Sequence, residues 1–201
     1  MNPPYESRVL PISNPYGVQH LLVKSTSNLW SILFDELNIE NNLAENLFHL
    51  GGIYLNHHRL TSDFLQNDPK AVLNPGDYLR VHQQPRRFPI ERLQYPDCIV
   101  DITKDYVLVN KPTGLPVHPT VDNIQENICA LLSTFLGEKL YVTHRLDMGT
   151  GGLFVLARTL QFQRYFNQLL ADGRVRKLYR AQVAGNYDGE LELTHYMEPS
   201  P

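Results

Sequence analysis

The sequence predicts an α+β protein built from two parts, and three observations support this prediction. Apolar residues recur at helical spacing between residues 28 and 50. Apolar or alternating segments typical of strands follow at residues 53–55, 78–82 and 106–109. Between the last two, residues 85–96 contain prolines and arginines typical of a linker. The pattern therefore divides the chain into an N-terminal and a C-terminal part.

The N-terminal part is predicted to contain an arm followed by a small module. Residues 1–25 are rich in proline, asparagine and serine, and they predict an irregular arm with one short strand near residues 21–23. The module is expected at residues 26–84. Its helical stripe is interrupted near Asn38 and ends at Gly51, since glycine commonly terminates a helix.

The C-terminal part, residues 97–201, is predicted to contain a second group of strands and helices. Helical spacing covers residues 123–136. The apolar run at residues 153–156 is typical of a strand buried on both faces. An amphipathic helix over residues 160–170 and a strand over residues 178–183 complete the predicted pattern.

The composition allows a real core and argues against wholesale disorder. Hydrophobic residues make up 42% of the chain, charged residues make up 19%, and the net charge is −3. Residues 1–100 hold eight Lys and Arg against ten Asp and Glu, so this half is predicted to make few phosphate contacts. Two basic clusters could each form a binding face or a solvated edge: Arg86, Arg87 and Arg92, and Arg174, Arg176, Lys177 and Arg180.

The two cysteines and the apolar segments indicate the cellular setting. Cys98 and Cys129 form no CxxC pair, so free buried thiols in a reducing compartment are expected. The N-terminus lacks the basic and apolar regions of a secretory signal, and no apolar stretch is long enough to span a membrane. We therefore expect a cytoplasmic protein without membrane contact, and a monomer.

The most informative segment is HRLDMGTGGLFVLA at residues 144–157. Asp147 lies at the mouth of a glycine-rich turn, and the apolar run that follows can hold such a carboxylate rigidly. Arg145 precedes it by two positions. A simpler alternative is a loop in which the Asp bonds its own turn and the Arg is a surface ion-pair partner. This segment by itself allows both interpretations.

Three segments in order resemble the RluA-type pseudouridine synthases. Residues 144–152 resemble the family signature, HRLD followed by Thr-Ser-Gly, with Gly151 in place of the usual Ser. Residues 109–119 (VNKPTGLPVHP) resemble its VNKPxGLxVHP block, and residues 175–181 (VRKLYRA) resemble its VxKxYxA block. The resemblance covers about residues 95–197.

The resemblance implies a catalytic domain with a mixed or antiparallel sheet, and it implies an enzyme. The family isomerises uridine to pseudouridine in structured RNA, either rRNA or tRNA, with one essential Asp and without cofactor or metal. Asp147 maps to that Asp, as nucleophile or as base. The family's domain continues into a block resembling GRTHQIRVH, so we expect the chain to be truncated at its C-terminus.

The resemblance also implies roles for four further residues. Arg145 would contact RNA and help hold the target nucleotide out of the stack, with a structural ion pair to Asp147 as the alternative. Tyr179 would stack on the extruded base, and its alternative is an ordinary half-buried strand tyrosine. Lys177 and Arg176 would contact phosphates.

Residues 52–56 and 73–77 resemble a small RNA-binding module named after a ribosomal small-subunit protein, although this half is not basic. Two other functions stay open. The first is a non-catalytic RNA-binding protein or a truncated, inactive remnant of the enzyme. The second is a protein-interaction fold unrelated to RNA, which the nearly neutral charge permits.

Overall fold

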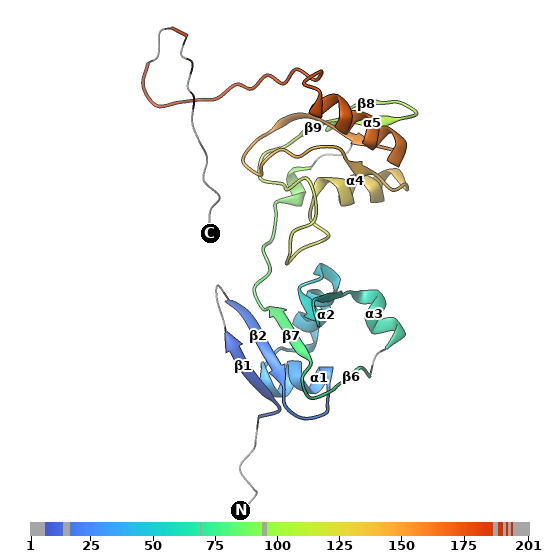
Figure 1. Cartoon of the computed structure of the whole chain (residues 1–201), viewed down its shortest axis with the longest axis vertical. Coiled ribbons are helices and arrows are strands. Elements are labelled where there is room, and N and C mark those ends of the chain that lie inside the picture. The colour runs from blue at the N-terminus through green and yellow to red at the C-terminus, as the bar shows by residue number, and fades with distance from the viewer. Residues whose placement is uncertain are drawn as a thin grey trace, which may run out of the picture.

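The computed structural model describes two bodies that follow one another along the chain (Figure 1). The N-terminal body contains one hydrophobic cluster, from Val9 to Val81, and the C-terminal body contains a second, from Phe88 to Leu156. None of the described helices is long and apolar enough to cross a membrane. The structure describes residues 7–13, 17–68, 70–93, 96–186, 189–190, 192 and 194.

A five-stranded antiparallel sheet forms one layer of the N-terminal body. The predicted strands at residues 53–55 and 78–82 are confirmed. In spatial order the strands are β1 (Val9–Ser13), β2 (Val18–Val23), β7 (Tyr78–His82), β4 (Ile53–Leu55) and β5 (His58–Leu60).

For the described part of residues 1–25, the predicted short strand near residues 21–23 is confirmed within β2, but the prediction of an otherwise irregular arm is wrong. β1 and β2 pair as a hairpin, and Val9, Leu21 and Val23 are buried in the core. The proline in β1 is compatible with this position, because β1 is an edge strand and Pro11 need not donate to a ladder. The proposed limits of the later regions, residues 26–84, 85–96 and 97–201, stay predictions.

Short helices cover one face of this sheet (Figure 1). The predicted interruption near Asn38 is confirmed, since its φ of 52° is left-handed and separates two helical segments. Gly51, with φ of 72°, ends the second segment. The helices are α1 (Leu29–Ser31), the π-helix η2 (Ile32–Glu36), α2 (Asn41–Leu50) and α3 (Ser62–Asn67), and β3 (Ser27–Asn28) pairs with β6 (Val72–Leu73).

The C-terminal body is built on a four-stranded antiparallel sheet, so the predicted α+β class is confirmed with antiparallel sheets in both bodies. The helix predicted over residues 123–136 begins only at Ile128, where Asn127 caps it. The elements are η3 (Ile90–Arg92), β8 (Ile99–Ile102), β9 (Tyr106–Lys111), α4 (Ile128–Leu136), β10 (Tyr141–Val142), β11 (Gly152–Ala157) and α5 (Leu160–Ala171); the sheet order is β10-β11-β9-β8.

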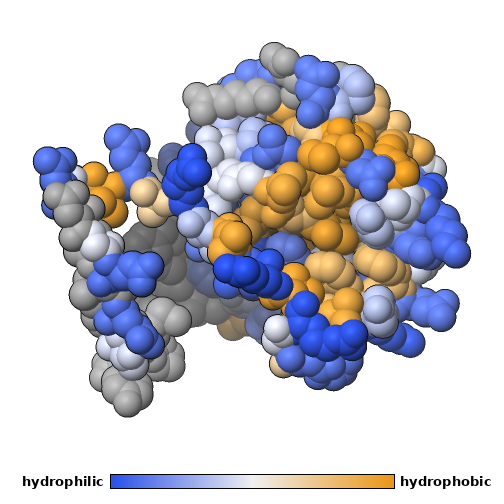
Figure 2. All heavy atoms as spheres, turned by 90° about the horizontal axis from the view of Figure 1, so that it is seen from above, coloured by the Kyte–Doolittle hydropathy of each residue, from blue (hydrophilic) through white to orange (hydrophobic). Residues whose placement is uncertain are grey.

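Two strand predictions for this body are wrong. Residues 153–156 are not buried on both faces: Phe154 is buried, but Leu153 is 61% exposed, because an antiparallel sheet presents alternate residues to opposite sides. Residues 178–183 form no strand, and they make no ladder of hydrogen bonds with any described strand. Figure 2 shows apolar side chains gathered on the exposed surface of the molecule seen from above.

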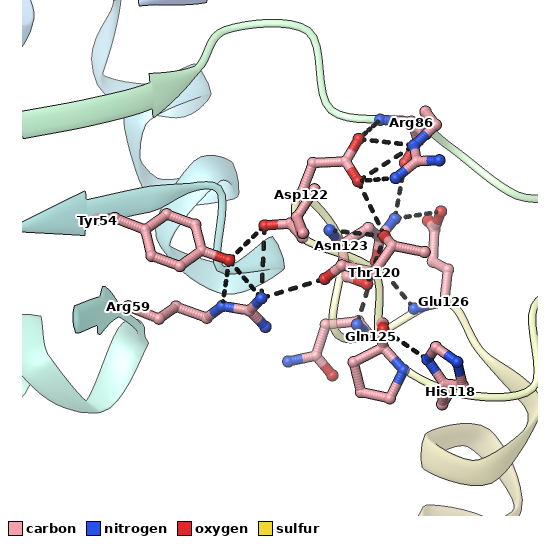
Figure 3. A network of polar contacts seen from close by, with 11 residues as sticks. Tyr54, Arg59, Arg86, His118, Thr120, Asp122, Asn123, Gln125 and Glu126 are labelled. Carbon is pink, nitrogen blue, oxygen red and sulfur yellow. Dashed lines mark hydrogen bonds and ion pairs between the residues drawn. The ribbon is translucent and has the colours of Figure 1, made fainter. Parts of the chain in front are cut away.

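The two bodies meet at a loop of residues 118–126, which we call the junction loop (Figure 3). The Ile124 amide donates to the Leu50 carbonyl over 2.9 Å. The Tyr54 hydroxyl donates to the Val121 carbonyl over 2.6 Å. These bonds join the end of α2 and strand β4 directly to the C-terminal body.

Candidate active site

The signature loop, residues 144–152, connects β10 to β11 and is held at its turn. The Thr150 amide donates to the Asp147 carbonyl over 3.0 Å, which closes the turn. The Gly114 amide donates to the Met148 carbonyl over 2.7 Å and ties the loop to the neighbouring block. Leu146 is buried, while Arg145 and Asp147 on either side of it are exposed. The predicted carboxylate therefore lies at the surface of an anchored turn.

A buried lysine lies beneath this turn. The Lys111 side chain is 1% exposed, and its Nζ donates to the carbonyls of Leu115 over 2.8 Å and Pro112 over 3.1 Å. It also lies 3.5 Å from the Met148 carbonyl of the signature loop. Burial lowers the pKa of Lys111, and the negative charge of Asp147 partly raises it again. One ammonium group thus joins two loops and interacts with the carboxylate.

The sequence did not single out Lys111 from the other residues of its block, 109–119. Its position at the end of an apolar strand, directly before Pro112, is the one signal that could have marked a buried cation. Proline has no backbone N–H to donate at that point. The Lys111 ammonium donates hydrogen bonds to the carbonyls of Pro112 and Leu115.

The glycine that replaces the usual Ser of the signature has a close neighbour. A Cβ atom at Gly151 would lie 3.1 Å from Thr113 Cγ2 and 3.2 Å from the Lys111 carbonyl oxygen. The next residue, Gly152, has φ of 121°, a conformation that side chains rarely adopt. Gly151 therefore allows the turn to lie close against the end of β9.

The histidine of the signature packs between aromatic rings. His144 stacks on Phe166 with ring centroids 6.0 Å apart, and it meets Phe154 edge-on at 6.2 Å. Burial lowers the pKa of His144, a backbone hydrogen bond at Arg145 partly raises it, and the charge of Lys177 lowers it further. The imidazole is therefore a neutral packing group at neutral pH, beside the candidate carboxylate.

The third block is not gathered into the same site. Arg176, Lys177 and Tyr179 follow α5 in a stretch of residues 174–186 without helix or strand, which we call the tail segment. Tyr179 is 65% exposed, and it makes no hydrogen bond or ring contact with another described residue. Only Lys177 is linked to the signature loop, through its electrostatic effect on His144.

Two arginines of the linker's basic cluster pair with buried carboxylates of the junction loop, and Figure 3 shows the pair of Arg86 with Asp122. Arg86 pairs with the buried Asp122, with Nη2 2.7 Å from Oδ1, and Arg87 Nε lies 2.8 Å from Oε1 of the buried Glu126. Burial raises the pKa of Asp122, but the hydrogen bonds from Arg86 outweigh it and hold that pKa well below its usual range. The side chain of Arg92 lies outside the described residues.

The described residues contain no group of three His, Cys, Asp or Glu side chains that could hold a metal ion. Both thiols are free, as predicted. Cys98 is buried, and Cys129 is only half-buried. Burial raises the pKa of both thiols, so neither is an activated nucleophile.

The chain is similar to RNA pseudouridine synthases. Residues 105–200 match the family model described as RNA pseudouridylate synthase. "RNA pseudouridine synthase 6, chloroplastic" from Oryza sativa subsp. japonica is 33% identical over 139 residues, covering 68% of this chain and 29% of that protein. The protein of the same name from Arabidopsis thaliana is 38% identical over 127 residues, covering 62% and 27%.

Two further similarities extend to bacteria and to a solved structure. "Ribosomal large subunit pseudouridine synthase D" from Neisseria meningitidis serogroup A is 30% identical over 142 residues, covering 66% of this chain and 38% of that protein. The solved structure "Human RNA Pseudouridylate Synthase Domain Containing 4" aligns with a TM-score of 0.34 and 32% identity, over 39% of this chain and 31% of that chain.

The chain spans between 27% and 38% of the length of these three curated relatives. The segments that resemble the family blocks, residues 109–119, 144–152 and 175–181, all lie within the matched residues 105–200. Because the family model and the curated relatives agree with the resemblance of these blocks, the chain belongs to the RluA-type RNA pseudouridine synthase family.

Proposed function

We propose that the protein to which this chain belongs isomerises uridine to pseudouridine in structured RNA, either rRNA or tRNA, with Asp147 as the catalytic group. The observation that supports this most directly is the exposed Asp147 carboxylate on a turn tied to Gly114 and underlain by the Lys111 ammonium. These bonds fix the backbone of the turn that carries the carboxylate, and the Lys111 ammonium interacts with it electrostatically.

The chemistry needs one oriented, ionised carboxylate. The bond between ribose C1′ and the base nitrogen must break, the base must turn, and C1′ must bond to a ring carbon, which then loses its proton while the freed nitrogen gains one. Asp147 can serve as nucleophile at C1′ or as base at the ribose, and both roles require the ionised form. Arg145, exposed on the other side of Leu146, is proposed to contact the RNA beside the extruded uridine.

The tail segment is proposed to contribute phosphate contacts. Arg176 and Lys177 are both exposed, and arginine and lysine commonly position a protein on the nucleic-acid backbone. Lys177 lies within electrostatic reach of His144, so a phosphate bound there would lie beside the signature loop. Tyr179 remains a proposed stacking partner for the base.

The test is to incubate the chain with total RNA and to map new pseudouridines by chemical labelling and primer extension. Wild type should form pseudouridine, whereas Asp147→Ala and Asp147→Asn should fall below detection with unchanged thermal unfolding. Asp97→Ala is the matched control, since it removes another exposed carboxylate from the same body. Wild-type rates in Asp147→Ala would show that the catalytic residue is assigned wrongly.

A second candidate function is RNA binding without isomerisation, and the exposed Tyr179 favours it. If the described conformation of the tail segment is the working one, the tyrosine is absent from the signature loop. The same experiment separates the two functions. A wild-type chain that binds RNA tightly but adds no pseudouridine to any RNA would support the non-catalytic alternative.

A further inference from the structure

The N-terminal sheet has an outer face, turned away from the helices, that carries polar and aromatic side chains. Successive residues of a strand point to opposite faces. In β7, Leu79 and Val81 are part of the hydrophobic core. Tyr78, Arg80 and His82 of the same strand therefore lie on the outer face.

The strand register aligns four side chains across this outer face. His20 on β2 faces Arg80 on β7, and Arg80 in turn faces Tyr54 on β4. Tyr54 faces Arg59 on β5. The Arg80 guanidinium lies 4.0 Å from the centroid of the Tyr54 ring. The Arg59 guanidinium lies 5.1 Å from the same centroid. Tyr54 is buried and Arg59 is hydrogen-bonded to the junction loop, so the half-buried Arg80 and His20 form the open end of this row.

A second set of rings lies beside this row. His57 packs on Tyr78 with ring centroids 5.0 Å apart and planes at 33°. His20 hydrogen-bonds the Tyr78 hydroxyl through Nδ1, with ring centroids 6.0 Å apart. His57 is exposed, and Tyr78 and His20 are half-buried, so part of this ring surface faces solvent.

The outer face is cationic even though the N-terminal half is acidic overall. Among the residues that the structure describes, no carboxylate forms an ion pair with Arg59 or Arg80. The Arg80 Nε is buried without a hydrogen-bond partner. Asp77, at the border, is engaged with Asn56 over 2.8 Å. Other acidic residues lie on the helices of the opposite layer: Asp35 and Glu36 on η2, Glu45 on α2 and Asp63 on α3.

One stretch of chain connects this face to the candidate active site. Arg59 Nη2 donates to the Thr120 carbonyl over 3.1 Å at one end of that stretch. At its other end the Gly114 amide donates to the carbonyl of Met148 in the signature loop. Residues 114–120 therefore contact the outer face of the module and the turn that carries Asp147.

We propose that the outer face binds a single-stranded segment of RNA, with Arg80 on a phosphate and the His57–Tyr78 rings against a base. A sheet face that combines an arginine with accessible rings suits single-stranded RNA, because bases stack on aromatic side chains while a cation holds the backbone. Its connection to the signature loop would let one RNA strand contact both surfaces. The proposal does not rest on isomerisation, since binding is measured without turnover.

The test measures the affinity of the full chain for a fluorescein-labelled oligouridine strand over a range of salt concentrations. Arg80→Gln should weaken binding about fivefold or more and lower the slope of log K against log salt by about 0.7. His57→Ala should weaken binding by roughly fivefold or more with an unchanged slope, since stacking is not a counterion effect. Arg80→Lys should keep the wild-type slope.

Lys70→Gln is the matched control, because it removes one exposed cation from the connection between α3 and β6, away from the outer face. It should leave affinity within about twofold. A 4-thiouridine strand should crosslink to β7 or to residues 56–58 in wild type and in Asp147→Ala, which separates binding from activity. Equal losses in Lys70→Gln and Arg80→Gln, or crosslinks confined to the C-terminal body, would overturn the proposal. The crosslinks also decide the matter if Arg80→Gln unfolds.

Discussion

The signature loop and the tail segment both carry family motifs, but the chain holds them very differently. The signature loop has a buried Leu146, a closed turn and the Lys111 ammonium beneath it. In the tail segment, Leu178 is 79% exposed and Val183 is 67% exposed. A motif is organised where the chain provides hydrogen-bond and packing partners, and a motif without them stays at the surface.

The difference lies in the partners that each segment needs. The signature loop is bounded by two strands of one sheet and bonds to a block that directly follows a third. A strand over residues 178–183 would need to pair with a neighbouring strand, and in the described structure it pairs with neither edge strand of the sheet, β8 or β10. A clear family motif in the sequence therefore does not imply that its segment forms a helix or strand or is held by neighbouring residues.

Replacing one lysine beneath the signature loop and one in the tail segment should give the largest difference in the free energy of unfolding. Lys111→Met leaves two or three buried carbonyls without their donor, and we expect it to lower the free energy of unfolding by about 2–4 kcal/mol. Lys177→Met, at an exposed position, should change it by less than about 0.5 kcal/mol. Urea denaturation of both variants measures the difference. Equal losses would mean that the ammonium does not hold the loop.

Two serine substitutions within the signature loop sharpen the comparison further. Gly151→Ser brings a side chain against Thr113 and the Lys111 carbonyl, and it should cost about 1–3 kcal/mol of stability. Gly149→Ser has open space around the added atom and should cost less than about 0.5 kcal/mol. A Gly151→Ser variant as stable as wild type would show that the turn can move away from β9.

The half-buried His144 predicts a dependence of stability on pH that arises in the signature loop. Because the pKa of His144 is lowered in the folded state, the unfolded chain binds the proton more readily, and stability falls as pH drops below about 6.5. One proton contributes at most about 1.4 kcal/mol per pH unit. His144→Phe keeps the ring packing and should flatten this dependence in urea denaturation. The lowered pKa of His82 leaves a residual slope in both proteins. An unchanged slope in His144→Phe would contradict the assignment.

Removal of the exposed tyrosine should have the smallest effect on stability. Tyr179→Ala should change the free energy of unfolding by less than about 0.5 kcal/mol, because its side chain has no described partner to lose. Brief trypsin treatment should cleave first within residues 174–180 and leave the Arg145–Leu146 bond of the signature loop intact, because Leu146 is buried. A large loss of stability, or early cleavage after Arg145, would reverse the contrast between the two regions.

Much of the secondary structure follows from local pattern. The limits of β7, the interruption at Asn38 and the end of α2 at Gly51 were all predicted from periodicity and glycine chemistry. The hairpin of β1 and β2 was not, because proline and serine hide its alternation and only pairing with β7 reveals the buried face.

For the candidate site too, some features follow from the sequence and others only from the tertiary structure. The blocks and their spacing identified the exposed Asp147 turn and its family, since turn chemistry depends on adjacent residues. Only the tertiary structure decided that Lys111 lies beneath that turn and that the linker arginines pair with Asp122 and Glu126. It also decided that Arg59 and Arg80 of an acidic module lie side by side with Tyr54 on one sheet face. Local conformation depends on neighbouring residues along the chain, whereas burial, charge pairing and shared faces depend on residues that only folding brings together.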